Sequence, residues 1–97
     1  MQKIEKISAM QSAALALHRG GQRLALIPTL GALHAGHDSL IKLAREKADT
    51  VIVSALVNPL QFGPSEDFAR YPRSPAADAA LSERAGVDLF FTPTAEE

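Results

Sequence analysis

Two histidines, His34 and His37, stand three residues apart around Gly36 in the segment PTLGALHAGH, residues 28–37. The charge of an imidazole changes near neutral pH, because its unperturbed pKa lies close to 6.5. Such a pair suits reactions in which crowded phosphate charge and a departing oxygen must be stabilised. Gly36 adds a backbone position without a Cβ, so a phosphate can approach closely. The spacing predicts a polyphosphate site, and we expect a bound triphosphate to favour protonation of both rings.

The residues on either side of the histidines predict the elements that position them. An apolar run predicts a buried strand over residues 23–27, and helical spacing of apolar residues predicts a helix over residues 36–47. The histidines then fall on the turn and the first helical turn, where unpaired backbone N–H groups and the helix dipole favour an anion. The alternative interpretation is a pair of histidines in an ordinary surface turn.

The remaining elements follow from turn signals and apolar spacing. A capping box at Ser8 and Gln11 predicts a first helix that ends at Gly20, and apolar residues predict strands over 50–57 and 88–91. Ser74 and Pro75 predict the start of a last helix. The residues expected on the buried faces are Met10, Ala13, Ala14 and Leu17 of the first helix and Ala77, Leu81 and Ala85 of the last.

A helix followed by alternating strands and helices predicts an α/β fold, a Rossmann-like parallel sheet with flanking helices. Ligands of such sheets bind beyond the carboxyl ends of the strands. Two irregular segments, residues 28–37 and 58–73, leave those ends. We therefore expect them to face one crevice.

Composition sets limits on the class of protein. Ninety-seven residues make one domain at most, and a net charge near −1 without clustered Lys or Arg gives no reason to expect nucleic acid as a partner. The absence of cysteine excludes disulfides and thiolate chemistry. No apolar run is long enough to cross a membrane, and the first residues do not resemble a signal peptide. We expect a soluble cytoplasmic protein.

Three segments carry a resemblance to a known family. PTLGALHAGH, VNPLQFGPSEDFARYPR and AGVDLFFTP, at residues 28–37, 57–73 and 85–93, resemble the N-terminal part of the pantothenate synthetases, the pantoate–β-alanine ligases. The HxGH element alone is shared with many nucleotidyltransferases and class I aminoacyl-tRNA synthetases. Its combination with the other two segments is specific.

The resemblance implies a reaction and a site. Members of the family use ATP and magnesium to condense pantoate with β-alanine through a pantoyl adenylate, which yields pantothenate, AMP and pyrophosphate, and they are usually homodimers. The resemblance implies that His37 is the catalytic proton donor and that Gln61 contacts pantoate and β-alanine. The positions that it implies for binding ATP are Leu30, Gly31, Ala32, Leu33, His34, Ala35, Gly36 and His37.

The chain departs from the family pattern in three ways. Leu30 stands where methionine is common, and Asp38 places a negative charge near the expected phosphates. The third departure is length, since the chain lacks the later parts of the nucleotide site and the C-terminal domain. We therefore interpret residues 1–97 as a partial nucleotide-binding domain that is inactive alone.

Several alternatives stay open. Gln61 could bond its own backbone, Arg70, Tyr71 and Arg73 could contact phosphates or pair with nearby acids, and Asp78 could reach magnesium or be an ordinary acid at a helix start. The chain could also be a catalytically incomplete nucleotide- or pantoate-binding module. Another HxGH nucleotidyltransferase is a third possibility, but its phosphorylated substrate would require extra basic residues.

Overall fold

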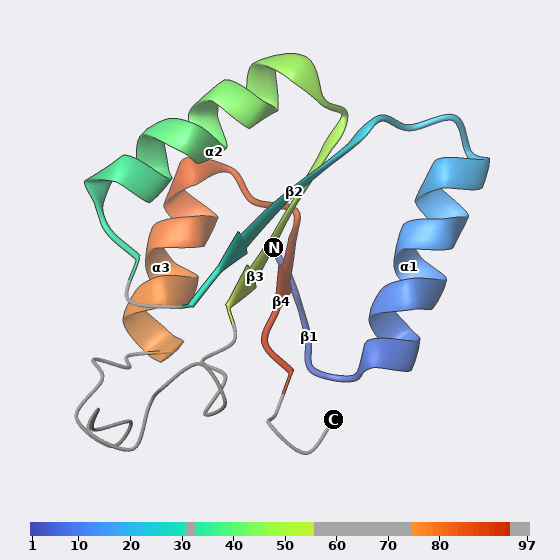
Figure 1. Cartoon of the computed structure of the whole chain (residues 1–97), viewed down its shortest axis with the longest axis horizontal. Coiled ribbons are helices and arrows are strands. Elements are labelled where there is room, and N and C mark those ends of the chain that lie inside the picture. The colour runs from blue at the N-terminus through green and yellow to red at the C-terminus, as the bar shows by residue number, and fades with distance from the viewer. Residues whose placement is uncertain (31–32, 56–74, 94–97) are drawn as a thin grey trace, which may run out of the picture.

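A small parallel α/β sheet organises the chain (Figure 1). The computed structural model describes residues 1–30, 33–55 and 75–93. In chain order, the elements are β1 (Gln2–Ile4), α1 (Ile7–Arg19), β2 (Leu24–Thr29), α2 (Ala35–Lys47), β3 (Thr50–Ala55), α3 (Pro75–Ala85) and β4 (Leu89–Phe91). No helix among these described residues is long and apolar enough to cross a membrane.

The strands lie in the order β1-β4-β3-β2, and every pair is parallel. Alternate residues of β3 point to opposite faces of the sheet, so both faces bear apolar side chains. Val51 and Val53 pack with Ile41 of α2 and with α3, whereas Ile52 packs on the other face, against α1. The sheet is therefore covered by α2 and α3 on one side and by α1 on the other (Figure 1).

The carboxyl ends of β2 and β3 lie side by side. Thr29 pairs with Ala55 in the register of the two strands, and the Thr29 hydroxyl donates a hydrogen bond of 2.9 Å to the Ser54 carbonyl oxygen. The chain leaves β2 at this edge to reach α2. The histidine segment thus begins at the sheet edge where parallel sheets bind their ligands.

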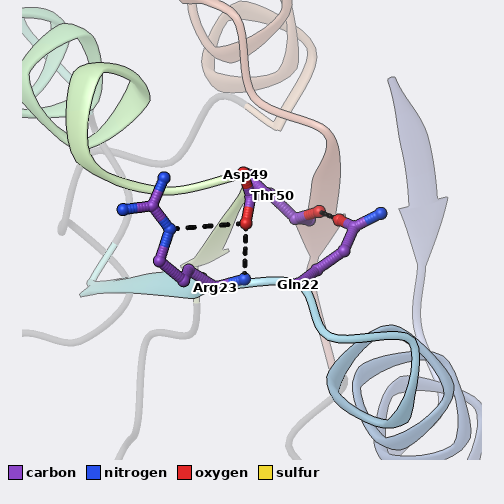
Figure 2. Close-up of polar contacts among 4 residues, drawn as sticks. All are labelled: Gln22, Arg23, Asp49 and Thr50. Carbon is purple, nitrogen blue, oxygen red and sulfur yellow. Dashed lines mark hydrogen bonds and ion pairs between the residues drawn. The ribbon is translucent and has the colours of Figure 1, made fainter.

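Polar side chains join the opposite, amino ends of the same strands (Figure 2). Asp49 Oδ2 accepts hydrogen bonds from the backbone N–H of Arg23 at 2.8 Å and from its Nε at 3.4 Å. The Thr50 hydroxyl donates to the side-chain carbonyl of Gln22. These contacts hold the start of β2 against the start of β3, far from the histidine edge.

Asp88 connects three elements at these amino ends. Its Oδ2 accepts hydrogen bonds from the backbone N–H of Val51 at 2.8 Å and from Arg45 Nη1 at 2.7 Å. Arg45 lies in the last turn of α2, and Asp88 immediately precedes β4. One carboxylate oxygen therefore ties α2, β3 and β4 together.

The predicted parallel α/β sheet is confirmed, whereas two local predictions were wrong and one strand was missed. β1 was not predicted. Ser8 does not cap α1, because the helix begins at Ile7 with Lys6 as its N-cap and no side-chain cap bond. Ala77 is exposed, and the buried face of α3 contains Asp78 and Ser82 instead. Residues 56–57 of the predicted strand, the expected cap Ser74 and the loop 58–73 lie outside the described residues.

Candidate functional site

The two histidines cap the start of α2 reciprocally. His34 is the N-cap residue, and its Nδ1 accepts a hydrogen bond of 3.1 Å from the backbone N–H of Gly36. His37 Nδ1 accepts one of 3.1 Å from the backbone N–H of His34. Two of the N–H groups that a helix start leaves unpaired are satisfied by imidazoles rather than by the usual Ser, Thr or Asp. The two histidines of the HxGH element therefore cap the helix that begins within this element.

These bonds fix the form of both rings. A neutral imidazole that accepts a hydrogen bond at Nδ1 carries its proton on Nε2. His34 and His37 therefore each offer an Nε2–H donor while they remain neutral. Protonation at Nδ1 would remove the acceptor and break a cap. Charge on the His37 ring thus competes directly with the helix start.

The rings also interact with each other. Their centroids lie 4.2 Å apart and their planes are tilted by 51°. The pKa of His37 lies below its usual value of 6.5, chiefly because partial burial disfavours the charged ring and also because of repulsion from His34, while Asp78 opposes the shift. Without a ligand, His37 is therefore the neutral Nε2–H form at neutral pH.

Gly36 makes room for the His34 ring. A Cβ on Gly36 would lie 2.9 Å from Cε1 and 3.2 Å from Nδ1 of His34. Such an approach is closer than real Cβ contacts allow, so the ring would have to leave its capping position. The absence of a Cβ at residue 36 thus serves the orientation of a histidine, in addition to the phosphate approach expected from the sequence.

Asp38 does not present an uncompensated charge. Its Oδ2 lies 3.0 Å from Nζ of Lys42, one helical turn later. An acid in the first turn of a helix also interacts favourably with the helix dipole. The negative charge that the sequence placed near the expected phosphates is therefore largely offset within α2 itself.

Asp78 belongs to this site, although its sequence context pointed only to a magnesium contact or an ordinary helix start. It lies in the first turn of α3, is only 6% exposed, and its Oδ1 accepts a hydrogen bond of 2.8 Å from the backbone N–H of Leu33. Its spacing from Ser82 and Ala85 places all three on one helical face. The face predicted from apolar spacing, with Ala77, Leu81 and Ala85, shares only Ala85 with it.

The structure describes part of the predicted ATP segment. Leu30 follows β2 and is 40% exposed, while Leu33 packs against the core beneath α2 and α3. His34, Ala35 and Gly36 are exposed and His37 is half-buried, so the segment presents an accessible surface at the start of α2. Outside the described residues lie Gly31, Ala32, Gln61, Arg70, Tyr71 and Arg73. The predicted juxtaposition of Gln61 with the two imidazoles stays a prediction.

The described part of the chain does not form a metal cage. No group of three or more His, Asp or Glu side chains in residues 1–30, 33–55 and 75–93 is placed to hold an ion. Of the carboxylates beside the start of α2, Asp38 forms an ion pair with Lys42, and Asp78 accepts a hydrogen bond from the Leu33 amide. These residues do not fit a magnesium site built from protein ligands alone.

A separate hollow of about 510 Å³ lies at the amino ends of the strands. Gln22, Asp49 and Thr50 line it together with α1, and neither histidine does. In parallel α/β sheets the ligand edge is the carboxyl one. We therefore place the candidate site at the start of α2.

Comparison with known proteins identifies the family of this chain. The family model described as pantoate-beta-alanine ligase matches residues 2–97. The chain belongs to this family. The pantothenate synthetase of Chloroherpeton thalassium is 54% identical over 96 residues, which cover 99% of this chain and 34% of that protein. The Koribacter versatilis enzyme is 50% identical over 97 residues, which cover 100% and 33%.

Solved structures of the family share the fold. The crystal structure of the Thermus thermophilus pantothenate synthetase has a TM-score of 0.89 at 43% identity and covers 100% of this chain and 33% of its own. The Francisella tularensis pantoate-beta-alanine ligase, complexed with beta-gamma ATP and beta-alanine, has a TM-score of 0.90 at 38% identity, with coverage of 99% and 36%. The chain spans about a third of the length of these relatives.

Proposed function

We propose that this chain supplies the N-terminal part of the active site of an enzyme that condenses pantoate with β-alanine at the expense of ATP. The observation that carries the proposal is the pair of imidazoles whose Nδ1 atoms cap α2 and whose Nε2–H donors remain for a ligand. The Francisella tularensis relative is complexed with beta-gamma ATP and beta-alanine, which supports the same substrates here.

In the proposed first step, the pantoate carboxylate attacks the α-phosphorus of ATP and the bond to pyrophosphate breaks. The donors at the start of α2 stabilise the phosphate charge. Bound ATP favours protonation of His37 at Nδ1, which releases its cap bond, and the charged ring then supplies its Nε2 proton to the departing pyrophosphate. The β-alanine amine then attacks the acyl carbon of pantoyl adenylate, which releases AMP and pantothenate. In this proposal Leu30–His37 line the phosphates, and the Gln61 amide holds pantoate and then β-alanine without neutralising the attacking group.

Magnesium enters the proposal as the companion of the triphosphate. Mg²⁺ is commonly held by substrate phosphates and water with few protein ligands. We assign it no ligand and no step among the described residues. We also propose a homodimer of the full-length protein and a cytoplasmic location, consistent with a biosynthetic family and a chain without cysteine.

Two assays separate this proposal from its alternatives. A full-length protein that carries these 97 residues should exchange labelled pyrophosphate into ATP when pantoate is present, and should release AMP when β-alanine is added. The 97 residues alone should do neither. Nucleotide binding without exchange in the full-length protein would indicate a binding module, and exchange that depends on another acid would indicate a different nucleotidyltransferase.

A further inference from the structure

Asp78 is a buried carboxylate that the proposed reaction does not use. It is 6% exposed, although acids in the first turn of a helix usually face solvent. Burial of a carboxylate is costly unless its oxygens are hydrogen-bonded. The bond of 2.8 Å from the Leu33 N–H to Asp78 Oδ1 meets that requirement across 45 residues of sequence. The buried position therefore favours a role for Asp78 in holding a backbone N–H group, which an exposed acid could not perform.

Leu33 is held from two directions. Its side chain packs against the buried cluster beneath α2 and α3, and its N–H is held by Asp78. The two helices contact each other on the same face of the sheet (Figure 1). The bond therefore fixes the amide N–H of Leu33, one residue before His34, against a packed helix rather than against solvent.

Both cap bonds depend on where Leu33 lies. The N–H of His34, the next residue, donates to His37 Nδ1, and the His34 ring accepts from Gly36. A displacement of Leu33 would move the next residue, His34, which carries the donor of the first bond and the ring of the second. The orientation of both Nε2–H groups is thus coupled to Leu33.

We propose that Asp78 is a positioning residue, which holds the Leu33 amide so that His34 and His37 cap α2 and direct their Nε2–H groups at the phosphates. This inference rests on the proposed function for its catalytic readout. Asp78 contacts no reacting atom in this role. The oxygen acceptor of Asp78, more than its charge, is the feature that matters.

The test compares Asp78→Ala with Asp78→Asn in a full-length protein that carries this chain. Asp78→Ala removes the acceptor and should lower kcat about 100-fold, because small misplacements of catalytic groups have effects of that size. Its KM for pantoate should stay unchanged. Asp78→Asn keeps an oxygen acceptor and should restore kcat to within about fivefold, the loss expected when a charged acceptor becomes neutral. The matched control, Glu83→Ala, changes an exposed acid on the same helix and should leave kcat unchanged.

Two spectroscopic readouts follow the bond without any turnover. In the unsubstituted protein, hydrogen exchange of the Leu33 amide should be at least about 100-fold slower than that of a free amide. The ¹⁵N shift of His37 Nδ1 should report a hydrogen-bonded acceptor, and this signature should disappear in Asp78→Ala and persist in Asp78→Asn. If Asp78→Ala does not fold, the kcat of Asp78→Asn and the exchange rate of the Leu33 amide test the inference instead.

The results that would contradict the inference about Asp78 can be told apart from one another. Unprotected exchange at Leu33, or full kcat in Asp78→Ala, would overturn the inference. An equal loss in both variants with a raised magnesium requirement would also overturn it and would make Asp78 a metal ligand. If the unsubstituted protein forms no pantothenate, the proposed function fails, and the two spectroscopic readouts still judge the role of Asp78.

Discussion

His37 Nδ1 accepts the backbone N–H of His34 at 3.1 Å, so the residue assigned as proton donor also closes the first turn of its own helix. The ring can cap the helix only while its Nδ1 is unprotonated. A neutral ring can still donate from Nε2. The helix start therefore selects the tautomer that a phosphate ligand needs, before any ligand arrives.

The first prediction concerns the pKa of His37. Burial, with repulsion from His34, places this pKa below 6.5. The folded state thus prefers the neutral ring, and the stability that this preference contributes is fully present above pH 6.5 and is lost as the pH falls toward the folded-state pKa. NMR titration of the imidazole should locate the pKa, and urea unfolding between about pH 5 and about pH 8 should show stability that rises with pH.

The control for this titration is His37→Gln, since glutamine at the third helical position caps a helix without titrating. Its unfolding free energy should lack the increment seen in the unsubstituted protein. A measured pKa above 6.5 in the free protein would contradict the prediction. Addition of ATP should raise the pKa, because a bound triphosphate favours the charged ring.

The second prediction separates the two roles of His37. Both His37→Ala and His37→Gln should lower turnover by about 10²- to 10⁴-fold, because each removes the proton donor. Only His37→Ala should also lower the unfolding free energy, by about 1 kcal/mol, because it removes the cap acceptor. His18→Ala changes an exposed histidine in the last turn of α1 and should leave turnover unchanged. Normal turnover in either His37 variant would exclude it as the donor.

The third prediction concerns Gly36. Gly36→Ala should displace the His34 ring, whose Cε1 would lie 2.9 Å from the new Cβ. Because the ring is exposed and can rotate away, the unfolding free energy should fall by about 1 kcal/mol or less, the value of one lost cap. ATP affinity, measured by calorimetry, should fall much more. The control is Gly20→Ala, where a Cβ would meet backbone oxygens no closer than 3.4 Å. Equal ATP affinity in the two variants would count against the ring-orienting role.

The sequence predicted the elements wherever the pattern was local. The apolar run of β3 and the helical spacing of α2 were sufficient, and the HxGH spacing located the start of α2. β1 gave no such signal, because three residues with one buried side chain form a strand only when β4 lies beside them. Its partner residues lie at the other end of the described chain.

The burial of Asp78 could not be predicted, for a different physical reason. A buried acid on a helical face interrupts the apolar spacing that marks a core-facing helix, and Ser82 interrupts it again one turn later. A tertiary contact, the hydrogen bond from the Leu33 amide, helps to make the burial of Asp78 tolerable. No local pattern contains that information, since the two residues belong to different elements.

The fourth prediction concerns the far edge of the sheet. Asp88→Ala leaves the Val51 N–H without its acceptor and should lower the unfolding free energy by about 1–3 kcal/mol. Arg45→Ala removes only an exposed ion pair and should lower it by less than about 1 kcal/mol. Urea unfolding measures both, and kcat should be unaffected in each. A larger loss in Arg45→Ala than in Asp88→Ala would show that the ion pair dominates.

The pairing of β1 with β4 sets an order of events during synthesis on the ribosome. Gln2 emerges well before its partner Leu89, which follows on the order of ten seconds later at ordinary elongation rates. Ile4 must wait through that interval without its neighbouring strand, while β2 and β3 can already pair. Pairing of β2 with β3 can therefore precede the docking of β1, which has to wait for β4.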